Sequence, residues 1–223
     1  MNHLAYYTIQ LSIWSVIIPF LAGVLWFKYL SRESKIIFLL VIVAIVPQIF
    51  TEFIVQGDFL NTLYNIYTPC EFAIIYLLFN KACYINLFKK IRLASVILFF
   101  GLSGAIITRY HINHRFLNEW VCMANLCYVA WISIFILQSL LDNDEIPDYR
   151  FPMFWYVSGL MLYAPATALV FSFYYSIGKN ELVKSLWIIH DIFNTTMYLF
   201  FAIGIYKNFR LSMADKEKEL VYI

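Results

Sequence analysis

The feature that most constrains this fold is a series of apolar runs, each about 20 residues long, that recur along the whole chain. A helix of that length spans about 30 Å, the thickness of the hydrocarbon core of a bilayer. Of the 223 residues, 62% are hydrophobic and only 13% are charged, which is too little polar surface for a water-soluble globule. The sequence therefore predicts an all-α integral membrane protein.

The runs predict seven spans joined by short connections. They lie at about 8–28, 36–55, 62–80, 92–110, 117–140, 153–175 and 184–206. We expect residues 1–210 to form one seven-helix transmembrane domain and residues 211–223 a short cytoplasmic tail. The first run has neither a basic leader nor a small-residue cleavage site, so we expect it to be a retained span and not a signal peptide.

The distribution of Lys and Arg predicts the orientation of the spans. Twelve fall on one side: Lys28, Arg32, Lys35, Lys81, Lys89, Lys90, Arg92, Arg150, Lys207, Arg210, Lys216 and Lys218. Four fall on the other: Arg109, Arg115, Lys179 and Lys184. Because basic residues concentrate in cytoplasmic loops, we expect the N-terminus outside, the C-terminus in the cytoplasm, and a location in the inner membrane.

The run at 62–80 contains the strongest functional candidate, Glu71, close to its middle. An ionisable side chain at that depth is costly and is a functional hypothesis by default. On a helix, Asn65 and Thr68 fall on the same face as Glu71. This span is therefore a largely apolar rod with one polar stripe.

Other runs carry polar stripes of the same kind. The candidate site residues are Glu52, Asn65, Thr68, Glu71, Asn125, Tyr163, His190, Asp191, Asn194 and Tyr198. Counted at 1.5 Å per residue, Glu71, Asn125 and Asp191 lie about 10–13 Å below the predicted outer surface. Because several helices turn polar faces inward at similar depths, we predict a polar pocket that opens outward.

The sequence allows more than one way to balance the charge of these carboxylates. No Lys or Arg lies at the predicted depth of Glu71 and Asp191. Either a carboxylate there is protonated, or His190 or a cationic ligand supplies the partner. The alternative to a ligand site is interhelical hydrogen bonding with no ligand at all.

Two resemblances bear on transport and on light sensing. Pro47–Gln48 is similar to the pair that marks the PQ-loop and SWEET-type transporters, and Pro47 and Pro165 are followed by Glu71 and Asp191 after 24 and 26 residues. That resemblance implies a small-solute or proton-coupled transporter with carboxylates near the midplane.

The seven-span plan also looks like the rhodopsins. However, the last span has no central lysine for a retinal Schiff base, which excludes a pigment.

A metal site is a third alternative. His111 and His114 form an HxxH pattern and, with His190, suggest zinc, as in membrane-embedded lipid hydrolases that resemble this chain in size and topology. Against this, His190 is predicted about 9 Å deeper than the two loop histidines.

The pattern IIHDIFN in the last run resembles that of small bacterial seven-helix membrane proteins of unassigned function, a resemblance that implies no known chemistry.

These observations favour a non-enzymatic, receptor-like or sensory module. We expect its partners to be the lipid bilayer, a small polar or cationic ligand that enters from outside, and a separate cytoplasmic signalling protein. We expect no cofactor and no nucleic acid. The second prediction is a transporter that uses the same carboxylates, and the third is a metal-dependent lipid hydrolase.

Overall fold

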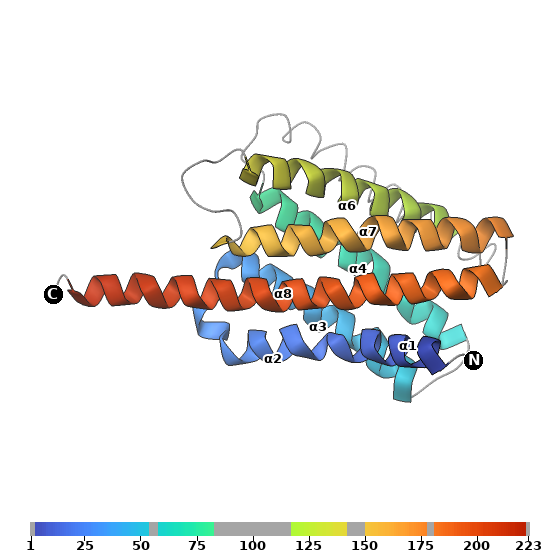
Figure 1. Cartoon of the computed structure of the whole chain (residues 1–223), viewed down its shortest axis with the longest axis horizontal. Helices are drawn as coiled ribbons and strands as arrows, with labels where there is room; N and C mark the ends of the chain where they lie inside the picture. The colour runs from blue at the N-terminus through green and yellow to red at the C-terminus, as the bar shows by residue number, and fades with distance from the viewer. Residues whose placement is uncertain (1–2, 54–57, 83–116, 142–149, 178–180, 222–223) are drawn as a thin grey trace.

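The structure, a computed structural model, describes residues 3–53, 58–82, 117–141, 150–177 and 181–221. These residues are helical, and no strand occurs among them. The helices are α1 (His3–Ser15), α2 (Ile17–Leu25), α3 (Arg32–Phe53), α4 (Asp58–Ala82), α6 (Leu117–Leu141), α7 (Pro152–Ile177) and α8 (Glu181–Val221), with a short 3₁₀ turn η1 (Phe27–Tyr29) between α2 and α3. Figure 1 shows their arrangement.

The length and composition of the helices agree with a protein that crosses the membrane several times. Within the described ranges, five segments are long and apolar enough to span a bilayer: Tyr6–Leu25, Arg32–Phe50, Met123–Leu141, Pro152–Phe173 and Ser185–Asp215. A shorter apolar segment, Ile66–Asn80, lies in α4. Each predicted span overlaps one helix, or two in the case of 8–28, except the span at 92–110, which lies outside the described residues. The all-helical fold class is confirmed, and the number of seven spans stays a prediction.

The first predicted span is divided into two helices at Val16. Pro19 has no backbone N–H and cannot donate to the carbonyl of Ser15, so the helical ladder is interrupted there. The ladder resumes when the N–H of Phe20 donates to the Val16 carbonyl at 3.3 Å. By contrast, α3, α4 and α7 each continue through an internal proline.

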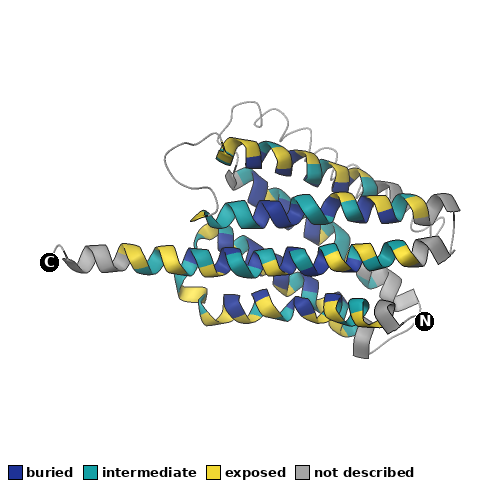
Figure 2. Ribbon diagram, viewed as in Figure 1, coloured by how far each residue is buried: buried dark blue, intermediate teal, exposed yellow. Residues whose placement is uncertain are grey.

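The last helix, α8, is the centre of the bundle. It lies between α7 on one side and α1 and α2 on the other, while α6 covers the far side of α7 and α3 pairs with α4 (Figure 1). The buried faces of these helices point toward one another, as the dark blue residues of Figure 2 show. Elements on both flanks therefore position their side chains against α8.

One close helix contact depends on a glycine in α8. A Cβ atom added at Gly204 would clash with the ring of Tyr156, a residue of α7. The Tyr156 hydroxyl in turn hydrogen-bonds the Ser34 hydroxyl of α3 at 2.7 Å. Gly204 therefore makes room for a ring that joins three helices.

Helix α8 extends well past the other helices. It has 41 residues, which corresponds to about 60 Å at 1.5 Å per residue. The predicted boundary between span and tail, near residue 210, has no break in the helix, and Figure 1 shows the C-terminal part projecting from the bundle.

Most basic residues of the described chain gather at the end of the bundle from which α8 projects, whereas Lys184 lies near the start of α8 at the opposite end. The α2–α3 junction, the start of α7 and the C-terminal part of α8 meet there (Figure 1). The described basic residues at this end are Lys28, Arg32, Lys35, Arg150, Lys207 and Arg210. We call it the basic end, and the N-terminus lies at the opposite end.

Candidate functional site

The buried face of α8 carries a stripe of polar residues in its first half. Asp191, Asn194, Thr195 and Tyr198 are all buried and recur at three- and four-residue intervals along one side of the helix. The Thr195 hydroxyl donates to the Asp191 carbonyl at 2.8 Å, a bond inside the helix. The side chains of Asn194 and Tyr198 hydrogen-bond residues of neighbouring helices, and that of Asp191 contacts His190 of α8, so this stripe is the core of the candidate site.

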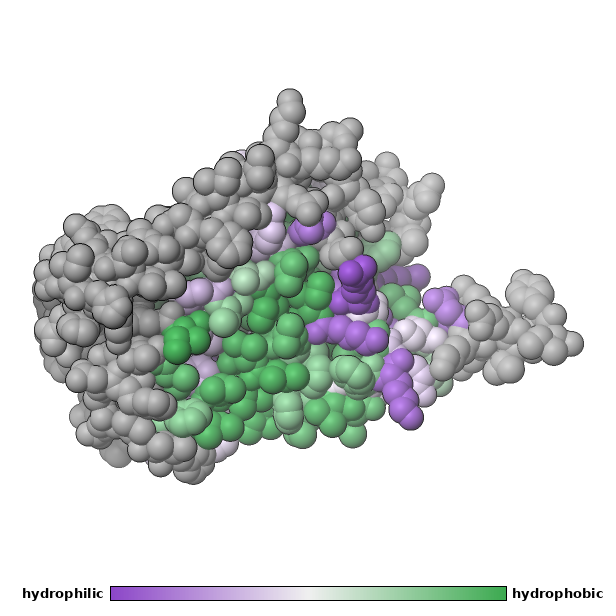
Figure 3. All heavy atoms as spheres, turned by 180° about the vertical axis from the view of Figure 1, so that it is seen from behind, coloured by the Kyte–Doolittle hydropathy of each residue, from purple (hydrophilic) through white to green (hydrophobic). Residues whose placement is uncertain are grey.

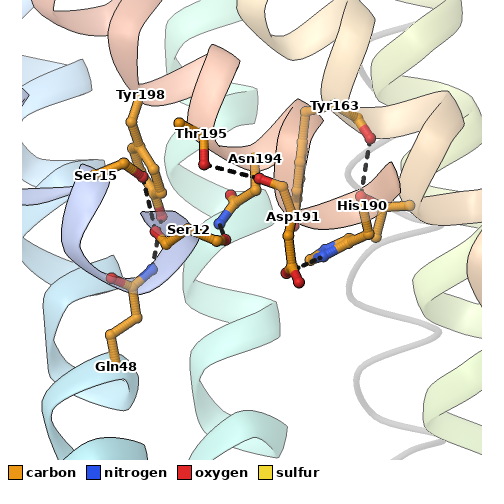
Figure 4. A network of polar contacts seen from close by, with 10 residues as sticks. Ser12, Ser15, Gln48, Tyr163, His190, Asp191, Asn194, Thr195 and Tyr198 are labelled. Atoms are coloured by element: carbon orange, nitrogen blue, oxygen red, sulfur yellow. Dashed lines mark hydrogen bonds and ion pairs between the residues drawn. The ribbon is translucent and has the colours of Figure 1, made fainter. Parts of the chain in front are cut away.

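Helix α1 meets this stripe through Ser12, which Ser15 of the same helix supports. The Asn194 amide Nδ2 donates to the Ser12 hydroxyl oxygen at 2.8 Å, and the Ser15 hydroxyl donates to the Ser12 carbonyl at 2.7 Å (Figure 4). Both serines are buried, and Ser15 is the last residue of α1, next to the break at Val16. The interrupted helix thus brings its end to the site.

Helix α3 contributes Gln48. Its Nε2 donates to the Tyr198 hydroxyl at 3.2 Å (Figure 4). The other amide atom, Oε1, is buried and has no hydrogen-bond partner among the described residues. An unmade hydrogen bond of a buried amide oxygen is costly, so this atom is an available acceptor beside the α8 stripe.

Aromatic rings surround His190. The centroid of its ring lies 5.8 Å from that of Tyr163 and 5.1 Å from that of Trp187. Trp187 also contacts Phe171, edge to face, at 6.0 Å. His190 Nδ1 is 3.4 Å from an Asp191 carboxylate oxygen, which is an ion pair only when the histidine is protonated (Figure 4).

Glu71, the strongest candidate from the sequence, is buried in α4, with a relative exposure of 8%. Its carboxylate hydrogen-bonds the phenol of Tyr67, one helical turn earlier. Tyr67 and Glu71 therefore form a polar pair on one face of α4.

The remaining candidate residues fall into two groups. Asn125 in α6 is buried and Thr68 in α4 is half-buried, and both make contacts with other residues. Glu52 and Asn65 belong to α3 and α4, but their side chains lie outside the described part of the structure. The structure therefore brings Gln48 and Tyr198 together, and His190 with Asp191 and Tyr163, while Glu71 pairs with Tyr67 of its own helix.

The predicted zinc alternative rests mostly on residues that are not described. His111 and His114 lie outside the described residues. Among the residues that the structure does describe, no group of three or more His, Cys, Asp or Glu side chains could hold a metal ion.

Several residues of this site carry little signal in the sequence. Ser12 and Ser15 are small hydroxyl residues in a run of apolar ones, and their only mark is a spacing of one helical turn. Trp187 is one of many aromatic residues in the chain. Their role appears only when α1 and α7 are placed against α8.

A second polar cluster lies at the basic end. The Ser31 backbone N–H donates to Asn208 Oδ1 at 2.7 Å, and the Ser212 hydroxyl donates to the Tyr29 carbonyl at 2.9 Å. Trp26 stacks on Phe209 with ring centroids 5.0 Å apart. We call these six residues the clasp, because they fasten α8 to the α2–α3 junction.

An apolar layer separates the candidate site from the clasp. Phe201 and Ile205 of α8 lie between Tyr198 and Asn208, and both are fully buried. On the flanking helices, the fully buried apolar residues at intermediate positions include Leu160 in α7 and Ile37 and Val41 in α3, beside the hydrogen-bonded hydroxyls of Tyr156 and Ser34. Side chains of this kind exclude water, so the two polar clusters are distinct.

The helices and their buried polar residues define an α-helical, multi-pass, membrane-embedded protein. Comparisons of the chain with models of protein families, with curated proteins and with solved structures found no match. The residues of the site offer two buried carboxylates, amide and hydroxyl groups, and aromatic faces, which together suit a small cation or a polar compound.

Proposed function

We propose that this protein is a receptor-like or sensory membrane module that signals to a separate cytoplasmic partner. A small polar or cationic ligand binds at Glu71, Asp191, Asn194 and Asn125, which are all buried. Buried carboxylates in a membrane protein are costly unless a charge or proton compensates them. A cationic ligand supplies that compensation, and His190 beside Asp191 supplies part of it when protonated.

The observation that carries this proposal is the continuity of α8. The helix has no proline and runs unbroken from Asp191 in the site to Asn208 in the clasp. These 17 positions correspond to about 26 Å along the helix axis. A shift or rotation of α8 at the site therefore also moves the clasp, and a partner bound at the basic end responds to that movement.

The proposed orientation follows from the basic end. With twelve Lys and Arg residues on that side of the sequence and four on the other, the basic end faces the cytoplasm of an inner membrane. The candidate site then lies toward the outer surface, where an external ligand arrives, and the projecting part of α8 lies in the cytoplasm. A receptor for an external signal requires this arrangement, with the ligand site outside and the partner site in the cytoplasm.

A transporter is the second candidate, and the break between α1 and α2 favours it. Transporters often build their binding sites at interrupted helices, where backbone groups become available to a solute. The break at Val16 adjoins Ser12 and Ser15 of the site. The buried apolar layer around Phe201 and Ile205 favours the receptor instead, because it closes the described part of the bundle between site and clasp.

The test is the thermal stability of the purified protein against a panel of organic cations, amino acids, polyols and metal ions. A ligand at one hundred times its dissociation constant stabilises the folded state by about 2.7 kcal/mol. For a chain of this size that corresponds to a shift in melting temperature of about 5–10 °C. The proposal expects this shift to vanish in Glu71→Gln or Asp191→Asn and to persist in Glu33→Gln, a matched change at the basic end.

Three other outcomes decide between the alternatives. Accumulation of the stabilising compound inside proteoliposomes would make the protein a transporter. A shift produced only by zinc or another divalent metal, and lost in His190→Ala, would favour the hydrolase. Stabilisation by no compound, together with loss of folded protein in Glu71→Gln, would show that these side chains only join the helices.

A further inference from the structure

The outer face of α3 carries a stripe of exposed residues that changes from basic to apolar along the helix. Arg32 and Lys35 are its first members. It continues with Leu39, Ile42, Val46 and Ile49, which are between 39% and 46% exposed. Because a helix advances 100° per residue, these six positions fall within an arc of about 100°. The stripe is therefore one continuous surface.

The turn before α3 adds to the basic part of this surface. Lys28 is exposed, and the ammonium group of Lys35 lies 5.6 Å from the ring centroid of the exposed Phe27. The clasp holds the turn in place through the Ser31–Asn208 bond and the contacts of Tyr29 and Trp26 with α8. The backbone that presents these cations is therefore fixed by α8.

The dimensions of the stripe match one leaflet of a bilayer. From Leu39 to Ile49 the helix rises about 15 Å, half of the hydrocarbon thickness. Lys35 and Arg32 lie about 6 and 10 Å beyond Leu39, at the level of the headgroups. Figure 3 shows a broad apolar surface on the back of the molecule, with hydrophilic side chains gathered at the edge toward the projecting end.

We propose that this surface is a binding site for an anionic phospholipid, and we call it the α3 lipid site. The headgroup phosphate binds Arg32, Lys35 and Lys28, and the acyl chains lie along Leu39, Ile42 and Val46. Charge complementarity selects an anionic lipid, because three cations face the headgroup and zwitterionic lipids carry no net charge. The acidic side chain of this turn is the half-buried Glu33, and the three cations outnumber it.

Arg150 provides a matched control on the same end of the bundle. It is also exposed, but it follows the acidic sequence DNDEIPD at 142–148. Its charge therefore follows four acidic residues in the sequence, whereas Arg32 and Lys35 lead directly into an apolar stripe. A specific lipid site on α3 should depend on Arg32 and Lys35 and not on Arg150.

The experiment is native mass spectrometry of the detergent-purified protein, titrated with phosphatidylglycerol or with phosphatidylcholine of the same acyl chains. Wild-type protein should retain phosphatidylglycerol in preference to phosphatidylcholine by about tenfold or more, since each basic residue near an anionic headgroup adds several-fold to the affinity. Arg32→Gln/Lys35→Gln should lose that preference, and Arg150→Gln should keep it. Soluble glycerol phosphate should compete only weakly, because it lacks the acyl chains.

Two results would overturn the proposal. Equal retention of the two lipids by wild-type protein would exclude selection for an anionic headgroup. An equal loss of preference in Arg150→Gln and Arg32→Gln/Lys35→Gln would show a diffuse effect of net charge without a site on α3. Circular dichroism and gel filtration verify that the variants fold, and Ile42→Ser, which leaves the charges intact, should weaken retention of both lipids.

Discussion

The Asn194 side chain donates a hydrogen bond of 2.8 Å to the hydroxyl oxygen of Ser12, joining two residues that are 182 positions apart in the chain. Both are buried, one in the first helix and the other in the last. The bond lies in the candidate site, and it fixes α1 against the helix that also carries Asp191 and Tyr198.

This bond should contribute measurably to stability. Hydrogen bonds between membrane helices are worth about 0.6 kcal/mol on average and up to about 1.7 kcal/mol. We expect Asn194→Ala and Ser12→Ala each to lower the free energy of unfolding by about 1 kcal/mol, and the double variant to lower it by less than the sum. Equilibrium unfolding in mixed micelles measures this coupling. Strict additivity of the two changes would show that the bond adds nothing.

The contact between Gly204 and Tyr156 leads to a second prediction. Gly204→Ala places a Cβ atom where the Tyr156 ring already lies, and overpacking of this kind costs about 1–3 kcal/mol. We expect a lower melting temperature and a smaller yield of folded protein. In a Tyr156→Leu background the same alanine should cost far less, since the ring is absent. An equal cost in both backgrounds would place its cause elsewhere.

The main features of the fold could be predicted from sequence because hydropathy and helix length are local properties. The predicted runs at 117–140 and 153–175 lie within α6 and α7, and the run at 36–55 overlaps most of α3. The break at Val16 could not be placed, because proline interrupts some membrane helices and is accommodated in others. Here Pro19 divides a span, whereas Pro47 and Pro165 lie inside continuous helices.

The site could be predicted only in part, for a similar reason. Periodicity shows which residues share a helical face, and Asp191, Asn194 and Tyr198 do lie on one buried face. It does not show which faces meet. The partners Ser12 and Gln48 come from helices far away in the sequence, and the clasp depends on Asn208, which follows the predicted last span.

The clasp leads to a third prediction. Asn208→Leu removes the acceptor of the Ser31 N–H, a bond of 2.7 Å in a largely buried position. We expect faster amide hydrogen exchange across the α2–α3 junction, by about fivefold for a bond worth about 1 kcal/mol. Thr196→Val, which removes a hydroxyl that donates to the Ile192 carbonyl within α8, is the control and should leave exchange at the junction unchanged. Unaltered exchange in Asn208→Leu would mean that the aromatic contacts alone hold the junction.

The same measurement tests whether α8 connects the site with the clasp. A ligand found by the stability panel should change exchange at the α2–α3 junction as well as around Asp191, because α8 is continuous between them. That response should be lost in Asn208→Leu while binding is retained. A ligand that protects only the site would separate binding from signalling and would favour the transporter.

The orientation leads to the last prediction. With Cys70, Cys83, Cys122 and Cys127 replaced by serine, single cysteines are introduced at His3, the first residue of α1, or at the exposed Arg210 of α8. A membrane-impermeant maleimide should label His3→Cys in intact cells and Arg210→Cys only after the membrane is permeabilised. We expect this pattern because Lys and Arg residues near the ends of membrane spans stay on the cytoplasmic side during insertion, which places the basic end there. The reverse pattern would place the candidate site toward the cytoplasm, so an external ligand could no longer be its signal. The α3 lipid site would survive that result, because its phosphate selectivity depends on the local charges of Arg32 and Lys35 and not on which leaflet supplies the lipid.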